Sequence, residues 1–404
     1  MVGIGLLGLG TVGTGVVEIL EKRQKEIYGL TGQEVKIKRI LVKDKDKDRE
    51  IKLDKNLITT NFKEIIDDKD IDIIVEVTGD LEGSYYYIIE ALNNNKHIVT
   101  ANKAVVSRYF EELSSMAEKK NLAFLYEASV GGGIPVLKPL KEQLDLNSIT
   151  EVQGILNGTC NYILTRMFSE GLDYDEVLKI AQDLGYAEAE PSADVEGHDT
   201  LRKLRILGTL ALQGKIGEED ILREGIERIT SFDIRQIKMM NSTVKLLGEV
   251  KELEDGYTAL VQPTIVNTNS YFANVNYAFN SVAFRGNNVG ELKFYGSGAG
   301  KLPTANAVLS DIIDIVQNSY RKGNSLGERK LVNLNEGLNG EYYLRISLSN
   351  EKIYNALFDI SKRVLTTKDN IAVVTNKVKL RDIIRLLIQL NVNKENYFIA
   401  RILD

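Results

Sequence analysis

The stretch that decides the fold is VGIGLLGLGTVG, residues 2–13. It joins an apolar, β-rich run to the glycine pattern Gly8-Leu9-Gly10-Thr11-Val12-Gly13, and helical periodicity follows in TGVVEILEKRQKEI (14–27). This order of strand, glycine turn and helix is typical of a dinucleotide-binding unit, because the glycines let backbone N–H groups at the helix start approach a pyrophosphate closely. A glycine-rich turn without a ligand is the alternative for the motif taken alone.

Further strand and helix patterns extend this unit into a sheet. The strand-like runs lie at 34–42, 71–77, 97–100 and 122–126. Helical stretches separate most of them, including 84–94 and 107–120. Strands that alternate with helices predict a doubly wound parallel sheet with right-handed crossovers. The predicted fold class is therefore α/β, with a Rossmann-type sheet at the start of the chain.

The pattern changes after EASVGGGIP (127–135). Residues 257–295 alternate in character, which predicts an antiparallel sheet, and the polar stretch 318–330 is expected to be a linker. The tail has five predicted elements, which are strand 342–348, helix 351–363, strand 371–378, helix 380–390 and strand 396–403. These patterns predict a second α+β part and a small C-terminal α+β part.

Composition limits the functions that the chain can have. Its 404 residues predict two or three domains, and the net charge of −6 argues against a nucleic-acid partner, which needs a basic face. No apolar run approaches the ~20 residues of a membrane span, and the opening VGIGLLGLG has no basic segment typical of a signal peptide. Cys160 is the only cysteine, which excludes internal disulfides and thiolate metal clusters. We therefore expect a cytoplasmic protein that acts on a small molecule, without a membrane partner.

Two lysines follow predicted strands of the sheet. Lys43 stands beside Asp44 in LVKDKDKD (41–48), where a basic residue favours the 2′-phosphate of NADP and an acidic one favours NAD. This side chain favours NADP, and the alternative is a solvated charged turn, above all for 45–48. Lys103 in TANKAVVS (100–107) follows the carboxyl end of a strand, where doubly wound sheets bind ligands, although a surface charge is the alternative.

A third lysine lies in YGSGAGK (295–301). This stretch resembles a phosphate-binding loop, but that pattern needs Gly at 295 and Ser or Thr at 302. The chain has Tyr295 and Leu302 instead. We therefore interpret the stretch as a packed turn that leads into a helix.

Asp199 and Lys203 lie in EAEPSADVEGHDTLRKL (188–204), in a helix predicted to start near Asp199. At about 100° per residue, Lys203 lies about 40° from Asp199, on the apolar side of the helix. The residues predicted on the opposite, solvent-facing side are Arg202, Arg205, Thr209 and Gln213, with His198 toward them. An exposed ion pair, the usual meaning of this spacing, belongs on the polar side.

A buried lysine is costly unless it is paired or functional, so we interpret Asp199 and Lys203 as parts of an active site. The loop before them is acidic, and it could hold a cationic group of a substrate. Its carboxylates are Glu188, Glu190, Asp194 and Glu196. The alternatives are a chance buried pair and a solvated loop.

Several motifs of the chain occur together in one known family. They are IGLLGLGTVGTGV, TANKA, YEASVGGGIP, GILNGTCNYIL, GYAEAEPSADVEGHDTLRKL and GSGAGKLPTANAV. In order and spacing, residues 1–320 resemble homoserine dehydrogenase, and the tail resembles the ACT domain appended to many bacterial members. The resemblance implies an NAD(P)-binding Rossmann domain (1–130), a substrate-binding and dimerisation domain (131–320), a linker (321–340) and an ACT-like regulatory domain (341–404). It also implies a homodimer.

The resemblance implies NAD(P)-dependent interconversion of L-homoserine and L-aspartate 4-semialdehyde, on the route to threonine, methionine and isoleucine. Lys203 matches the family's proton donor. Asp199 and Glu188 match substrate-binding carboxylates, with Asp194 beside them, and Lys103 matches a lysine near substrate and nicotinamide. The implied cofactor-binding residues are Gly8, Leu9, Gly10, Thr11, Val12, Gly13, Lys43, Thr78 and Lys103.

Two further features follow from the same resemblance. EASVGGGI matches a loop that binds a monovalent cation, sodium, which implies ligation by Glu127 and the carbonyls of Val130, Gly132 and Ile134. The tail reads SLSNEKIYNALF (347–358), without the glycine that usually helps to form the family's effector site. The tail is therefore expected to be a separable module whose effector is left open.

Two other functions are alternatives. Another semialdehyde or hydroxy-acid dehydrogenase is disfavoured, because Cys160 opens a helix with no histidine nearby in sequence and does not stand where an acyl nucleophile is expected. A redox-sensing Rossmann protein would bind NAD(P)H without turnover.

Overall fold

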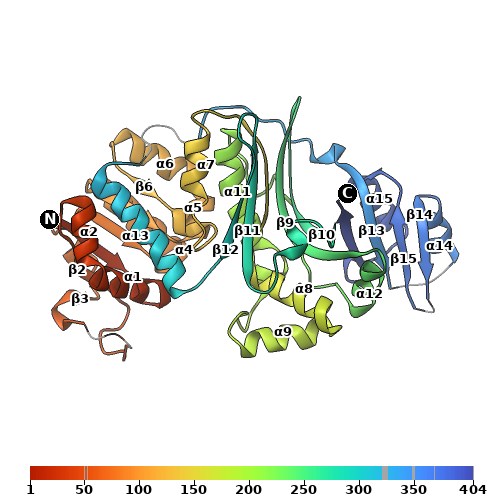
Figure 1. Ribbon diagram of the computed structural model, residues 1–404, viewed down its shortest axis with the longest axis horizontal. Helices are drawn as coiled ribbons and strands as arrows, with labels where there is room; N and C mark the ends of the chain where they lie inside the picture. Colours follow the sequence, from red (N-terminus) through yellow and green to blue (C-terminus); the bar gives the residue numbers. More distant parts are fainter. Residues whose placement is uncertain (50, 52, 321–325, 348–350, 368, 404) are drawn as a thin grey trace. The chain divides into compact units, whose positions relative to one another are not determined.

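The computed structural model describes residues 1–403 except 50, 52, 321–325, 348–350 and 368. These residues form two compact units, each assembled from separate parts of the chain (Figure 1). The first unit contains Met1–Ile149, Arg205–Glu218 and Arg285–Lys330. The second contains Thr150–Leu204, Glu219–Phe284 and Leu331–Asp404. Part of the predicted linker, 321–325, lies outside the described residues.

The first unit is built on a parallel sheet with the strand order β3-β2-β1-β4-β5-β6. The strands are β1 (Val2–Leu7), β2 (Val35–Leu41), β3 (Ile58–Thr59), β4 (Ile73–Glu76), β5 (His97–Thr100) and β6 (Phe124–Leu125). This confirms the predicted Rossmann-like sheet. Because Leu7 pairs with both Leu41 and Glu76, and Glu76 pairs with Thr100, the carboxyl ends of these strands meet at one edge. Ligands bind at this edge in doubly wound sheets.

The helices of the first unit pack around this sheet. They are α1 (Thr11–Lys22), α2 (Gln24–Thr31), α3 (Lys63–Ile66), α4 (Leu81–Asn93), α5 (Lys103–Arg108), α6 (Phe110–Lys119), α7 (Leu137–Gln143) and α13 (Lys301–Gln317); the unit also holds strand β12 (Gly290–Ser297). Helices α1 and α13 lie side by side (Figure 1), and they approach closely because Gly15 has no side chain: a Cβ there would lie 2.7 Å from the Lys301 carbonyl oxygen. The predicted helix 107–120 is wrong in one respect, since the chain breaks it into α5 and α6 at Tyr109.

The second unit is built on a mixed sheet in which β11-β7-β9-β10-β17-β13-β15-β14 are successive neighbours. The strands before the tail are β7 (Ile149–Ile155), β8 (Leu222–Arg223), β9 (Ser242–Leu253), β10 (Gly256–Asn267) and β11 (Phe279–Gly286). Strand β9 pairs antiparallel with β10 along their whole length. The sequence pattern missed β9 because residues 242–250 are buried without interruption, so they show no alternation.

The helices of the second unit include the segment that carries the predicted active site. They are α8 (Gly158–Glu170), α9 (Tyr174–Asp183), α10 (Ser192–Val195) and α12 (Ser231–Met239). Helix α11 (His198–Leu212) belongs to the second unit up to Leu204 and to the first unit beyond it. No helix in the described part of the chain is long and apolar enough to cross a membrane.

Apart from the short strand β16, the tail forms a β-α-β-β-α-β module within the second unit. Its elements are β13 (Asn339–Ile346), α14 (Glu351–Phe358), β14 (Ser361–Thr366), β15 (Ile371–Thr375), the short strand β16 (Val378–Lys379), α15 (Leu380–Gln389) and β17 (Tyr397–Ile402). The predicted helix 351–363 is too long, because α14 ends at Phe358. The strand β14 follows it and pairs with β15. The tail continues the sheet of the unit, since β17 pairs in parallel with β10.

Candidate active site

The glycine turn between β1 and α1 has the geometry that a bound pyrophosphate requires. Gly8 adopts φ +103°, which favours glycine, and a Cβ at Gly13 would lie 2.1 Å from the Gly8 carbonyl oxygen. Gly10 has no atom near its would-be Cβ, so its backbone is open on that side. The first N–H groups of α1 lack partners within the helix, and they favour an anion. These residues therefore fit a dinucleotide.

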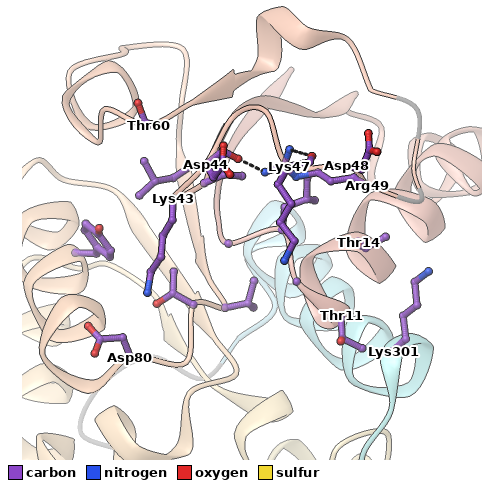
Figure 2. A pocket seen from close by; sticks show the side chains of 18 residues that line it. Thr11, Thr14, Lys43, Asp44, Lys47, Asp48, Arg49, Thr60, Asp80 and Lys301 are labelled. Carbon is purple, nitrogen blue, oxygen red and sulfur yellow. Dashed lines mark hydrogen bonds between the residues drawn. The ribbon is translucent and has the colours of Figure 1, made fainter.

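A pocket of about 830 Å³ adjoins this turn (Figure 2). Its lining is Gly8, Leu9, Gly10, Thr11, Thr14, Leu41, Val42, Lys43, Asp44, Lys47, Asp48, Arg49, Thr60, Val77, Thr78, Asp80, Tyr87 and Lys301. Among the predicted cofactor residues it includes Lys43 and Thr78, whereas Val12, Gly13 and Lys103 are outside the lining. Lys301, which we interpreted as part of a packed turn, also lines the pocket. Its Nζ lies 2.5 Å from Glu18 Oε1.

One wall of this pocket is cationic. Figure 2 shows Lys43 and Lys47 extending into the pocket from the loop after β2, with Arg49 beside Lys47. Arg49 donates to the carbonyl oxygens of Asp44 and Lys47, the latter at 2.7 Å, which holds the loop together. Sequence reasoning singled out Lys43 and gave a solvated charged turn as the alternative, above all for 45–48; these residues are exposed, and Lys47 and Asp48 nevertheless line the pocket. The alternating KDKDKD pattern hid Lys47, because each lysine there has an acidic neighbour.

A buried hydrogen-bond network supports Thr78 and Lys103 at the carboxyl edge of the sheet. Glu76 is fully buried, and its carboxylate accepts from the Thr78 N–H and hydroxyl, both at 2.7 Å, and from the Thr100 hydroxyl at 2.8 Å. Asn102 caps α5 by accepting from the backbone N–H of Ala104 at 3.1 Å. Lys103 is therefore the first residue of a capped helix. Sequence reasoning missed Glu76 and Asn102, although an acidic residue ending the apolar strand IDIIVEV was a signal.

In the second unit, Asp199 and Lys203 form a buried pair near the start of α11. The Lys203 Nζ lies 2.8 Å from Asp199 Oδ2 and donates to the Leu156 carbonyl oxygen at 2.7 Å. Lys203 is 8% exposed and Asp199 is 5% exposed, which confirms that they lie on the buried side of the helix. The His198 side chain is half-exposed, and its Nε2 lies 3.3 Å from Glu196 Oε2.

The prediction for the opposite side of α11 is wrong for two of its residues. Arg205 is 3% exposed and Thr209 is fully buried, whereas Arg202, Gln213 and His198 are partly exposed. Arg205 donates to both carboxylate oxygens of Glu111 at 2.8 Å and to the Ser107 carbonyl oxygen. Arg205 and Thr209 can be buried because the guanidinium group and the hydroxyl have hydrogen-bond partners, which a helical wheel cannot show.

The acidic loop divides into buried and exposed members. Asn157, the N-cap of α8, donates to Asp194 Oδ1 at 2.7 Å and to Asp199 Oδ2 at 2.9 Å, which brings these two carboxylates together. Glu188 is exposed, and its carbonyl oxygen accepts from Gln182 at 3.1 Å. The Glu196 carboxylate lies near His198, and its Oε2 is 3.6 Å from a guanidinium nitrogen of Arg223. The predicted carboxylates Asp194 and Asp199 thus belong to one cluster.

Cys160 lies next to this cluster but does not have the character of a nucleophile. It is fully buried, and burial raises the pKa of its thiol well above the ordinary value. Its Sγ donates to the Asp194 carbonyl oxygen at 3.2 Å. A buried, protonated thiol is inert, which argues against an acyl-enzyme mechanism at this residue.

The predicted cation loop begins with a glutamate that caps a helix. The Glu127 carboxylate accepts from the backbone N–H groups of Val136 at 2.6 Å, Leu137 at 2.9 Å and Lys138 at 2.8 Å. Burial raises the pKa of Glu127, and these hydrogen bonds oppose that shift. Three N–H dipoles thus converge on this carboxylate, and they use most of its acceptor positions. The predicted ligation by Glu127, Val130, Gly132 and Ile134 stays a prediction.

Comparisons with known proteins agree with the fold. Two family models match: the NAD binding domain of homoserine dehydrogenase over residues 8–127, and homoserine dehydrogenase over residues 135–313. The chain is 44% identical to the homoserine dehydrogenase of Bacillus subtilis over 315 residues, covering 78% of this chain and 73% of that one.

Solved structures give the same result. A homoserine dehydrogenase from Thiobacillus denitrificans matches with a TM-score of 0.90 and 34% identity, covering 100% of this chain and 98% of that one. A hyperthermophilic archaeal homoserine dehydrogenase in complex with NADPH matches with a TM-score of 0.67 and 26% identity, over 80% and 99% of the two chains. The chain belongs to the homoserine dehydrogenase family, the NAD(P)-dependent oxidoreductases of amino-acid biosynthesis that interconvert L-homoserine and L-aspartate 4-semialdehyde.

Proposed function

We propose that Lys203 is the proton donor of this reaction and that Asp199 holds its ammonium group in place. The observation that carries the proposal is the buried geometry of the pair. Among the described residues, the acceptors of hydrogen bonds from Lys203 Nζ are the Leu156 carbonyl oxygen and Asp199 Oδ2. An ammonium group has three N–H donors, so one is left for an oxygen of the substrate.

The roles of the residues follow from this arrangement. When bound, the nicotinamide supplies or accepts the hydride. In the reducing direction, the third N–H of Lys203 donates to the aldehyde oxygen, stabilises the negative charge that develops there and transfers its proton to give the alcohol. In the oxidising direction the neutral amine takes that proton back. Between turnovers, the hydrogen bond to Asp199 holds the ammonium group of the lysine in place.

The substrate's ammonium group is proposed to bind the carboxylates of the acidic loop. Asp194 and Asp199 support this proposal because the Asn157 amide draws them together in a largely buried place, where a cation is attracted strongly. Glu188 is the exposed member of the proposed set. For Lys103, a place near substrate and nicotinamide is supported by its position at the carboxyl edge of the sheet, where ligands bind.

The cofactor is proposed to be NADP in preference to NAD. Lys43, Lys47 and Arg49 give the pocket wall a surplus of positive charge over Asp44 and Asp48, and such a wall favours a 2′-phosphate. The NADPH complex of the archaeal relative supports this preference.

Three further predictions come from the family resemblance. An ACT-like identity for residues 341–404 is supported by the β-α-β-β-α-β order of the tail. The segment SLSNEKIYNALF (347–358) lacks the glycine that usually helps to form the family's effector site, and its residues 348–350 lie outside the described residues. A sodium ion and a homodimer stay predictions, which sodium-dependent kinetics and light scattering would test.

A spectrophotometric assay with L-homoserine and NADP tests the proposed function most simply. The proposal predicts homoserine-dependent formation of NADPH. Another hydroxy-acid dehydrogenase would need a different substrate, and a redox sensor would bind NADPH without turnover.

A further inference from the structure

The corner between β7 and α8 holds both members of the Lys203–Asp199 pair. Leu156 and Asn157 are consecutive residues of this corner. The Leu156 carbonyl oxygen accepts from Lys203 Nζ at 2.7 Å, and the Asn157 side chain donates to Asp199 Oδ2 at 2.9 Å. Two adjacent residues therefore bind the lysine and the aspartate separately, from one turn of backbone.

The Asn157 side chain uses its oxygen and its nitrogen for different partners. Its Oδ1 accepts from the Cys160 backbone N–H at 2.8 Å, which caps α8 and fixes the orientation of the amide. Its Nδ2 donates to Asp199 and, at 2.7 Å, to Asp194 Oδ1. Asn157 is 5% exposed. A neutral amide is suited to this place, because it accepts one hydrogen bond and donates two without adding a charge.

The carboxylates that Asn157 binds come from two different elements. Asp194 lies in the short helix α10, and Asp199 lies in the first turn of α11. Like charges held close together repel, so an amide that donates to both stabilises the ionised pair. Removing those donors would let the carboxylates separate and would take the Asn157 hydrogen bond away from Asp199.

We propose that Asn157 is a positioning residue that sets the geometry of the Lys203–Asp199 pair and holds Asp194 beside it. This inference rests on the proposed roles of Lys203 and Asp199. Its effect on the reaction is indirect: the amide fixes Asp199 Oδ2, and Asp199 in turn fixes the Lys203 Nζ. A displacement of about 1 Å at a reacting group can cost on the order of 10² in rate.

Asn157→Ser separates this role from capping. The serine hydroxyl is as good an N-cap acceptor as asparagine, but it is too short to donate to both carboxylates. We expect Asn157→Ser to fold with a thermal midpoint near that of the parent, and to lose roughly 10-fold to 100-fold in kcat. Asn161→Ser is the matched control, because Asn161 lies one turn further along α8 and donates to the carbonyl oxygens of Val275 and Phe279 instead. It should lower the thermal midpoint and retain kcat per folded molecule.

Asn157→Asp gives a second readout that a purely structural role would not change. The aspartate still caps α8 but places a third carboxylate against Asp194 and Asp199, so one of them retains a proton at higher pH. A protonated Asp at 157 can donate one hydrogen bond. The ratio of its kcat to that of the parent should therefore rise as pH falls.

The inference is overturned if Asn157→Ser keeps kcat and the KM for homoserine within about twofold, or if the kcat ratio for Asn157→Asp is constant with pH. Lys203→Ala, measured beside these variants, separates this failure from that of the proposed function. An inactive Lys203→Ala with an unaffected Asn157→Ser would remove only the role of Asn157. An active Lys203→Ala would remove the proposed proton donor itself.

Discussion

Asp233 and Arg345 form a fully buried ion pair between the α12 cap and the tail strand β13. Arg345 Nε lies 2.9 Å and 3.0 Å from the two carboxylate oxygens of Asp233, and the residues are 4% and 0% exposed. The Tyr343 hydroxyl donates to the same carboxylate at 2.8 Å. Removing the arginine leaves a buried charge without its partner, so Arg345→Ala should lower the free energy of unfolding by about 3–5 kcal/mol.

Urea unfolding measures this change, with Arg381→Ala as the control. A guanidinium nitrogen of Arg381 lies 3.2 Å from Glu336 Oε2 in an exposed ion pair. Arg381→Ala should lower the free energy of unfolding by no more than about 1 kcal/mol. Equal, small effects for both variants would mean that the tail is held by other contacts. The separability of residues 341–404 stays a prediction. Truncation removes the Asp233–Arg345 pair, so we expect a second unit that folds without the tail to be less stable than the intact unit.

Lys43 should determine part of the preference for NADP. Lys43→Ala removes a charge from the pocket wall, and the KM for NADP should rise roughly tenfold, as the loss of a charge-assisted hydrogen bond of about 1.5 kcal/mol implies. The KM for NAD should change little, since it has no 2′-phosphate. Lys45→Ala is the control, because Lys45 lies in the same loop outside the pocket lining. Equal increases for both cofactors would remove Lys43 from phosphate recognition.

Glu127 and Asp311 should make the stability of the first unit depend on pH. The Glu127 N–H donates to Asp311 Oδ2 at 2.9 Å, and burial raises the pKa of both carboxyl groups. A raised pKa means that the folded state binds more protons than the unfolded state. The contribution of each group to the free energy of unfolding is therefore fully present below its unfolded pKa, near 4, and is lost as pH rises through its folded pKa. The loss is at most about 1.4 kcal/mol per pH unit for each group.

Asp311→Asn tests this dependence, because the amide cannot ionise and its oxygen can still accept from Glu127. The variant should show a flatter decrease of the thermal midpoint between pH 4 and pH 8 than the parent. Parallel curves for the two proteins would show that Asp311 does not carry the dependence.

The features predicted from sequence are those that depend on local pattern. The parallel sheet, the glycine turn and the buried side of α11 follow from periodicity and glycine spacing. Strand β9 and the buried Arg205 were missed because their environment is set by distant segments: Arg205 is buried only because Glu111 and Ser107 meet it. Asn157 was missed for the same reason, since its carboxylate partners lie 37 and 42 residues away along the chain.

The kcat of Lys203→Ala tests the central claim most directly. If Lys203 donates the proton, kcat should fall by roughly 10²–10⁴ while NADPH still binds, because the glycine turn and the pocket belong to the first unit. His198→Ala is the control: its side chain is half-exposed, and the variant should keep most of its activity. An active Lys203→Ala together with an inactive His198→Ala would contradict the account.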